Sequence, residues 1–310
     1  MKKILITLSL LIIGFTSYSQ EQLQPLKYYK VAFHIVRTSA GTIGREGLEI
    51  DIQKAIKYTN NKFFRANVQL YICEINYIDN DELYNFYHND ADQLTAPYNI
   101  NDAVNVYLCN TISSSYYPDG IWGIVGSGII ALRHHTFDEL VISTHEFGLF
   151  FGLLHTHGGA HEYVERINCA IAGDFLCDTP ADPGLHLDQD VDENCNYIGG
   201  AVDANGQEYD PDETLIMSHA RHKCRTRFSP GQIQRLNFYA NENRLLALSH
   251  SHAFEDITIT TNQDIEEDVI LINNTKIENN AEVKLKSCAF VEISGDSEVK
   301  LGSTLDITIE

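Results

Sequence analysis

The eleven-residue stretch His-Glu-Phe-Gly-Leu-Phe-Phe-Gly-Leu-Leu-His, which begins at His145, constrains the fold more than any other part of the chain. Its spacing follows the zinc-binding pattern H-E-x-x-H-x-x-G-x-x-H, in which two imidazoles one helical turn apart share a face and a glutamate between them activates water. His145, Glu146, Gly152 and His155 occupy their places, but Leu149 stands where the second imidazole is expected. The pattern predicts a helix that ends near Gly152, a turn that returns His155, and a metal site short of one ligand.

The N-terminus has the composition of an export signal. Residues 1–19 combine a basic start, an apolar core from Ile4 to Phe15 and a small-residue exit, and residues 20–29 form a polar linker. The apolar core is shorter than the roughly 20 residues that a membrane helix needs, and no other segment is long and apolar enough. We therefore predict a signal peptide, no membrane insertion, and a mature protein that is secreted or held at the cell surface.

The net charge of -21 excludes two classes of partner. Nucleic acid and anionic membrane surfaces are both negatively charged, so they would repel an acidic protein.

Seven cysteines in an exported chain indicate disulfides. The four that lie close together in sequence are expected to form two bridges, with three pairings open: Cys169, Cys177, Cys195 and Cys224. They lack the C-x-x-C pairs of a structural zinc site. Cys73 and Cys109 fall in predicted strands and are interpreted as buried thiols, whereas Cys288 lies in the tail, far from the others.

Residues 30–250 are expected to form one domain. Its predicted elements are a strand at 30–37, a helix at 47–64, strands at 68–77 and 102–108, an irregular edge strand at 120–132 above a cleft, and the motif-bearing helix at 137–151. From residue 156 to 214 the composition is that of loops, and the four clustered cysteines would staple them. A last helix is predicted to begin at Ser229-Pro230 and to end near Leu248.

Residues 255–310 have a different character. Short alternating strands are separated by turn residues every eight to ten positions, and the segment holds 13 acidic and 4 basic residues. We predict a separate small all-β module, either a short β-solenoid or a sandwich-like appendage. It contains no catalytic constellation, so packing, surface attachment or export sorting are its expected roles.

Three further segments make the metal motif more specific. They are Gly-Asp-Phe-Leu-Cys-Asp-Thr-Pro at 173–180, Leu-Ile-Met-Ser at 215–218, and Arg-Phe-Ser-Pro-Gly-Gln at 227–232. Together and in this order they resemble the pappalysin family of metzincin metallopeptidases, over roughly residues 30–248.

The resemblance implies an α+β fold, with a twisted mixed sheet and the active-site helix above the cleft and a disulfide-stapled C-terminal subdomain below it. It implies zinc held by His145, position 149 and His155, with Glu146 as general base and Met217 in the methionine turn beneath the metal. Peptides or proteins would be the substrates.

Some family members also bind calcium. By the same resemblance, Asp174 and Asp178 are candidate calcium ligands in this chain.

The chain departs from the family pattern twice. Besides Leu149, His219 follows Met217 by two positions, where these enzymes commonly carry a tyrosine. In one interpretation the protein is a secreted zinc-dependent metalloendopeptidase with a substitute third ligand. His219 is then the first candidate, and the weaker candidates are His157, His161 and the pair His134-His135.

In the other interpretation the protein is a catalytically inactive metzincin that acts as an extracellular peptide- or protein-binding module. Leucine has no lone pair to donate, which favours this alternative. Against it, Glu146 would be a costly buried carboxylate without its metal, and we therefore favour the peptidase by a narrow margin.

Overall fold

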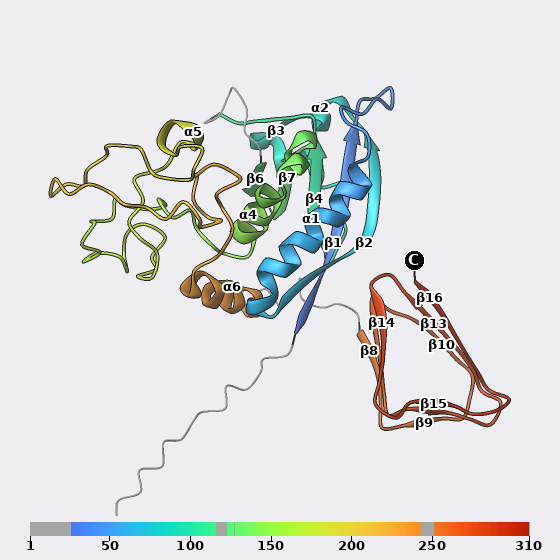
Figure 1. Cartoon of the computed structure of the whole chain (residues 1–310). Coiled ribbons are helices and arrows are strands. Elements are labelled where there is room, and N and C mark those ends of the chain that lie inside the picture. The colour runs from blue at the N-terminus through green and yellow to red at the C-terminus, as the bar shows by residue number, and fades with distance from the viewer. Residues whose placement is uncertain (1–25, 116–122, 127, 243–250, 310) are drawn as a thin grey trace, which may run out of the picture.

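The computed structural model describes residues 26–115, 123–126, 128–242 and 251–309. The predicted signal peptide and most of the predicted linker lie outside these residues. Figure 1 shows three parts, namely a sheet covered by helices, a loop-rich region on one side of it, and a triangular β module on the other side. Within the described residues, no helix has the length and hydrophobicity needed to cross a membrane.

The sheet-and-helix part follows the predicted alternation of strands and helices. Its strands are β1 (Lys27–Arg37), β2 (Val68–Asp79), β3 (Asn85–Tyr87), β4 (Val104–Cys109), β5 (Thr111–Ser113), β6 (Gly123–Gly126) and β7 (Ile129–Arg133). Its helices are α1 (Leu48–Phe63), α2 (Asp81–Tyr84), α3 (Ala91–Thr95) and α4 (Leu140–Phe150), with 3-10 turns η1 (Phe64–Ala66), η2 (His88–Asp90) and η3 (His134–Asp138).

The main sheet has the order β2-β1-β4-β7-β6. The first four strands are parallel, and only β6 runs antiparallel, at the edge beside β7. The sheet is therefore mixed, as predicted. The region predicted as one irregular edge strand at 120–132 is instead two paired strands, β6 and β7, with Gly128 at positive φ (74°) between them. That prediction was wrong because the glycines mark a turn as well as an edge.

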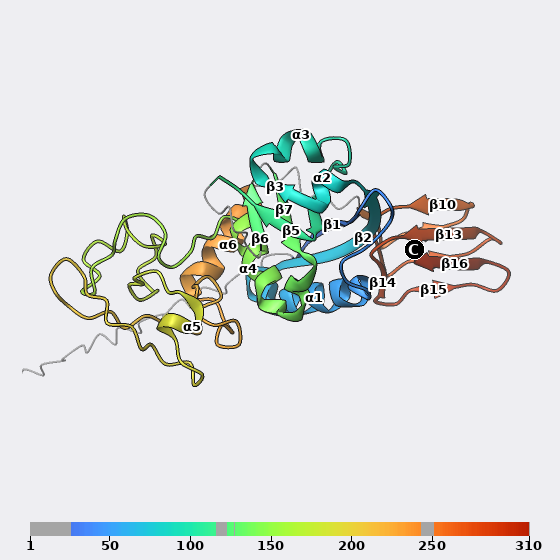
Figure 2. The ribbon, with the colours of Figure 1, turned by 90° about the horizontal axis from the view of Figure 1, so that it is seen from above.

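Both faces of this sheet are covered. Alternate β1 residues such as Phe33 and Ile35 pack in one core with α1 and α4, whereas Val36 and Tyr107 pack in a second core with residues of α2, β3 and α3. Figure 2 shows these two groups of helices on opposite sides of the sheet. Side chains of a strand alternate between faces, so a strand that is buried on both faces reads as a continuous apolar run.

The loop-rich region runs from Phe151 to Ser229 and contains one short helix, α5 (Leu187–Asp190). Two disulfides staple it, Cys169–Cys177 and Cys195–Cys224, which selects one of the three pairings left open by the sequence.

Helix α6 (Pro230–Glu242) follows and returns the chain to the sheet. Ser229 caps it, because its Oγ accepts from the Gln232 amide (3.1 Å) while the Gln232 side chain accepts from the Ser229 amide (3.0 Å). The Tyr29 hydroxyl donates to the Ala240 carbonyl at the far end (2.6 Å). The predicted continuation of this helix to Leu248 lies outside the described residues.

The C-terminal module is a parallel β-solenoid, one of the two architectures that the sequence allowed. Its strands are β8 (Ser251–Glu255), β9 (Thr258–Ile259), β10 (Gln263–Glu266), β11 (Val269–Asn273), β12 (Lys276–Ile277), β13 (Glu282–Ser287), β14 (Phe290–Ser294), β15 (Glu298–Val299) and β16 (Thr304–Ile309). They form three parallel sheets, β14-β11-β8, β15-β12-β9 and β10-β13-β16, which are the sides of the triangle in Figure 1.

One corner of the solenoid repeats from coil to coil. Asp256, Asn274 and Gly295 all have positive φ there (50°, 45° and 62°). The side-chain Nδ2 of Asn274 donates to the Asp256 carboxylate (3.0 Å). A Cβ on Gly295 would lie 2.1 Å from the Asn274 side chain. Only glycine therefore fits the third corner.

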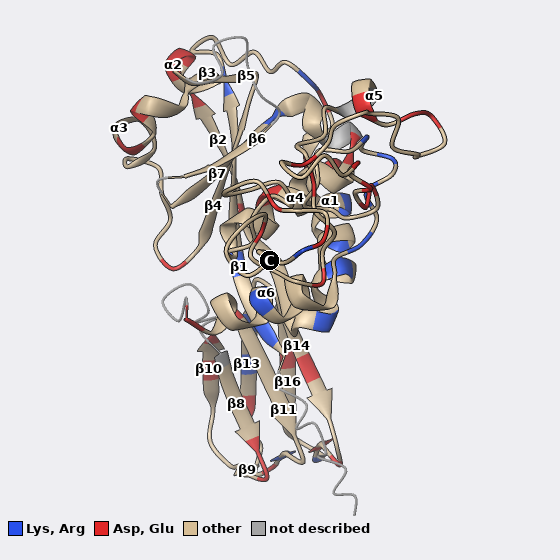
Figure 3. Ribbon diagram, turned by 90° about the vertical axis from the view of Figure 1, so that its left-hand side faces the viewer, with Lys and Arg blue, Asp and Glu red and all other residues tan. Residues whose placement is uncertain are grey.

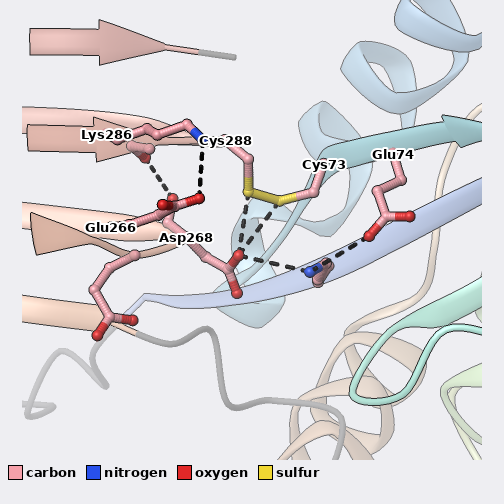
Figure 4. A pocket seen from close by; sticks show the side chains of 9 residues that line it. Cys73, Glu74, Glu266, Asp268, Lys286 and Cys288 are labelled. Atoms are coloured by element: carbon pink, nitrogen blue, oxygen red, sulfur yellow. Dashed lines mark hydrogen bonds and ion pairs between the residues drawn. A yellow bond between two sulfur atoms is a disulfide. The ribbon is translucent and has the colours of Figure 1, made fainter.

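A disulfide between Cys73 in β2 and Cys288 joins the module to the main sheet. The interpretation of Cys73 as a buried thiol was therefore wrong, because its partner lies 215 residues away in another module. A pocket of about 400 Å³ lies at this junction, and Figure 4 shows Asp268 beside the disulfide. Asp268 also lies 3.7 Å from the Lys30 ammonium. Cys109 is a free buried cysteine, as predicted, and burial raises the pKa of its thiol.

Acidic residues are not confined to one surface. In Figure 3 they are spread over α2, α3, the loop-rich region and the module strands. This distribution gives the chain a dispersed negative charge rather than a single acidic patch.

Candidate metal centre

Helix α4 carries the first two residues of the motif, and both are buried. His145 is 4% exposed and Glu146 is 6% exposed. The helix ends at Phe150, and Gly152 then has a φ of +83°. A Cβ on Gly152 would lie 2.5 Å from the Tyr239 ring of α6. Glycine is therefore required twice over at this turn, by its backbone conformation and by the close approach of α6.

The turn brings His155 back to His145, as the motif predicted, and His219 completes a cluster of three imidazoles. The Nε2 atoms of His145 and His155 are 3.1 Å apart. The His219 ring centre lies 4.5 Å from that of His155 and 5.9 Å from that of His145. One ring nitrogen from each residue falls within 4.8 Å of the other two.

Leu149 contributes nothing to this cluster. It is half-buried and packs against the main hydrophobic core. The third nitrogen therefore comes from His219 on the segment after Met217, not from the helix position where the motif usually provides it.

Hydrogen bonding prepares His145 for a metal. Its Nδ1 lies 2.8 Å from the Ile216 carbonyl, which can only accept, so we assign the proton to Nδ1 and the lone pair to Nε2. A backbone carbonyl behind a ligand imidazole is the usual support in metal sites.

The three rings are neutral at neutral pH, which is the form that binds metal. Burial holds the pKa of His145 well below its usual value, with Arg225 adding to the effect. Burial, followed by neighbouring His157, lowers the pKa of His155 to about 4. Burial, followed by His155, lowers the pKa of His219 to about 2.

The donor set fits zinc. Three imidazoles are a common protein ligand set for this ion, and two nitrogens each about 2.0–2.1 Å from a tetrahedral zinc stand about 3.3 Å apart. The 3.1 Å between the Nε2 atoms of His145 and His155 is close to that value.

Glu146 has an unsatisfied buried oxygen. Among the residues that the structure describes, its Oε2 has no hydrogen-bond partner, and burial raises the pKa of the carboxyl to about 8, although Arg225 opposes the shift. Strand β6 lies directly against it, because a Cβ on Gly123 would be 2.9 Å from the carboxyl carbon. An unpaired buried carboxylate is costly, so this oxygen indicates a place where a charged or polar group belongs.

Met217 packs against α4, and its role in a methionine turn stays a prediction. It is fully buried, and a Cβ on Gly148 would be 2.8 Å from its sulfur. Its carbonyl accepts from the Thr156 amide (3.1 Å), which ties this segment to the turn that carries His155.

The weaker ligand candidates lie outside the cluster. His157 stacks on His155 with ring centres 5.2 Å apart but is not among the three residues whose nitrogens converge. His134 is engaged with the Leu108 carbonyl (2.9 Å), and His135 and His161 are exposed.

The calcium candidates already have protein partners. Asp174 accepts from the Thr179 hydroxyl (2.8 Å) and the side-chain Nε2 of Gln232 (3.2 Å), and Asp178 accepts from the backbone amide of Gly231 (2.6 Å). A calcium role for them stays a prediction.

Arg225 was missed by sequence reasoning. It is only 5% exposed, and its Nη1 lies 3.3 Å from Nδ1 of His145. Its neighbours Thr226 and Arg227 are exposed. An isolated arginine after a cysteine carries no motif, so nothing in the sequence distinguished it from a surface residue.

The fold is similar to solved structures of mirolysin. Mirolysin from Tannerella forsythia in complex with a cleaved peptide has 15% identity and a TM-score of 0.51, over 72% of this chain and 99% of that chain. Mirolysin in complex with compound 9 has 14% identity and a TM-score of 0.50, with the same coverage. No protein-family model and no curated protein matches the chain. At such identity the likeness concerns the fold alone. It confirms the predicted α+β metzincin-like fold, whereas placement among the pappalysins stays a prediction.

Proposed function

We propose that the protein is a zinc-dependent peptidase whose ion is held by His145, His155 and His219. The observation that carries this proposal is the convergence of one ring nitrogen from each residue within 4.8 Å. Three protein ligands are what a catalytic zinc normally keeps, which leaves one position open for water or substrate.

Bound zinc would supply a Lewis acid that polarises a peptide carbonyl and makes water a better nucleophile. Glu146 would act as general base, taking a proton from the attacking water and passing it to the leaving amine. Its buried Oε2, which has no partner within the described part of the chain, and its position one residue after His145 support this role. A cation nearby would also lower the pKa of the Glu146 carboxyl from about 8, which favours the ionised base.

The substrate would be a peptide or protein. The mirolysin structure with a similar fold contains a cleaved peptide, and β6 places an edge strand beside Glu146. We propose that the chain is exported, since three disulfides are typical of proteins that fold in an oxidising compartment. Surface attachment or sorting remains the proposed role of the solenoid module.

A second candidate function is a non-catalytic extracellular binding module. Leu149 favours it, because this residue stands in a ligand position and packs into the core instead. The two functions differ in whether the site binds metal and in whether Glu146 matters for peptide cleavage.

The deciding experiment measures zinc per chain and cleavage of a peptide library for the wild type and three variants. His219→Ala removes a proposed ligand, Glu146→Ala removes the base, and His161→Ala removes an exposed histidine outside the cluster. We expect about one zinc per chain in the wild type. We expect His219→Ala to weaken zinc binding more than the roughly 10–100-fold that second-shell changes cost.

Glu146→Ala should abolish cleavage while it keeps the zinc, and His161→Ala should resemble the wild type. A wild type that stays free of zinc in micromolar zinc would sink the peptidase proposal and leave the binding module. Zinc binding that survives His219→Ala unchanged would show that His219 is no ligand.

A further inference from the structure

Arg225 is a buried cation that has no part in the proposed reaction but lies against the site. Its Nη1 is 3.1 Å from the Ser218 carbonyl and 3.5 Å from the Ile216 carbonyl. These two carbonyls flank Met217. The same nitrogen lies 3.3 Å from Nδ1 of His145. Since Nδ1 of His145 already carries the proton that the Ile216 carbonyl accepts, the guanidinium donates to the two carbonyls and only lies beside the ring of His145.

The third ligand of this site needs such support. In the usual motif the second imidazole is fixed on the helix, one turn from the first. Here His219 follows Met217 in a stretch without regular secondary structure. Its position depends on the hydrogen bonds of that stretch, such as Ser218 amide to Leu215 carbonyl (3.1 Å) and Thr156 amide to Met217 carbonyl (3.1 Å).

Arg225 is itself firmly held. The preceding residue, Cys224, is disulfide-bonded to Cys195. The Ile216 amide donates to the Arg227 carbonyl (2.8 Å), which pairs the arginine segment with the methionine turn.

The charge of Arg225 also has partners nearby. Burial lowers its pKa to about 10, so it stays cationic at neutral pH, and the groups that oppose this shift are Glu146, Glu139 and Tyr58. Burying a cation this close to three imidazoles is electrostatically costly. The hydrogen bonds of Arg225 to the Ser218 and Ile216 carbonyls must offset that cost.

We propose that Arg225 is a positioning residue that clamps the carbonyls on either side of Met217 and thereby fixes His219 relative to His145. This inference rests on the proposed metal site. Arginine suits the task because its planar guanidinium offers several donors in a fixed fork, whereas lysine offers a flexible point charge. The hydrogen bonds of Arg225 would hold His219 in place, as the helix holds the second imidazole in the usual motif.

The test compares Arg225→Met and Arg225→Lys with the matched controls Arg227→Met and Arg227→Lys. Arg227 lies two residues away, is exposed, and pairs with Asp212. Zinc affinity is measured by competition with a chromophoric chelator. We expect Arg225→Met to weaken zinc binding about 10–100-fold, Arg225→Lys to restore only part of the loss, and both controls to stay within about twofold. Equal affinity of Arg225→Met and Arg227→Met would overturn the inference.

A second measurement uses metal-free protein with labelled histidines. The rings of His155 and His219 are 4.5 Å apart at their centres, close enough for a nuclear Overhauser contact between ring protons. We expect this contact at full strength in the wild type and the Arg227 variants, its loss in Arg225→Met, and a weakened contact in Arg225→Lys. A merely structural role would lower the melting temperature but leave the contact in place.

The two measurements separate the possible failures. If the wild type binds no zinc, the proposed function fails, and the ring contact still decides whether Arg225 positions His219. If Arg225→Met does not fold, Arg225→Lys keeps the charge and gives both readouts. A ring contact of wild-type strength in a folded Arg225 variant overturns the positioning role.

Discussion

Replacing Glu146 by glutamine should change how the stability of the metal-free protein depends on pH. Burial raises the pKa of this carboxyl from 4.5 to about 8 in the folded chain. Glutamine has nearly the same shape but cannot ionise. The variant therefore removes one titration and little else.

The sign and size of the effect follow from this pKa. Below pH 4.5 the carboxyl is protonated in both the folded and the unfolded chain, and the neutral form is tolerated in the core. Between pH 4.5 and 8 only the unfolded chain releases the proton, so the free energy of unfolding falls by about 1.4 kcal/mol per pH unit. Above pH 8 the accumulated loss would reach at most about 5 kcal/mol, which relaxation and water entry would reduce.

The assay is thermal unfolding in a chelator at about pH 5, 7 and 9, with Glu139→Gln as the control. Glu139 lies exposed just before the same helix. We expect Glu146→Gln to match the wild type near pH 5 and to exceed it by several degrees at pH 9, at roughly 2–4 °C per kcal/mol. Saturating zinc should shrink the difference, because a cation favours the ionised carboxylate. A gap that is the same at every pH, or that widens as the pH falls, would refute this account of Glu146.

Three further changes test the scaffold around the site. Gly152→Ala should lower the free energy of unfolding by about 2–4 kcal/mol, because the backbone there is left-handed and a Cβ would meet Tyr239. Urea unfolding measures this loss, and a loss under about 0.5 kcal/mol would contradict the prediction. Ser229→Ala should cost about 1 kcal/mol by removing the cap of α6, seen as a lower urea midpoint with an unchanged slope. Cys73→Ser combined with Cys288→Ser should make the module easier to cleave by proteases while zinc affinity stays the same; equal protease resistance would show that the remaining contacts suffice to dock it.

The elements of the main domain could be predicted from the sequence because their patterns are local. The apolar run of β1 and the helical spacing of α1 each follow from burial of that element alone, and the observed bounds lie within a few residues of those expected. The bond between Cys73 and Cys288 could not be predicted in this way. It depends on how two separately folded modules dock, and no periodicity within either module encodes that arrangement.

The same distinction, between what local sequence pattern predicts and what depends on tertiary packing, applies to the candidate site. Spacing within one helix and one turn was enough to predict that His145 and His155 meet. The approach of His219 depends on tertiary packing of Met217 against Gly148, which the resemblance suggested but local pattern could not establish. No sequence pattern predicted the burial of Arg225, because that burial results from the fold of the loop-rich region around it.

The two departures from the usual motif are related in space. Leu149 stands in a ligand position of the zinc-binding motif, and His219 stands where the resemblance predicts a tyrosine. Either difference alone would be expected to weaken a peptidase. In the structure the His219 ring lies beside His145 and His155, while Leu149 packs into the core. The proposed ligand set, drawn from α4, the following turn and the segment after Met217, has three imidazoles but not two of them on one helix. The metal affinity of the proposed site would then depend on the packing and the disulfide that hold the loop-rich region in place, more than on the helix that defined the motif.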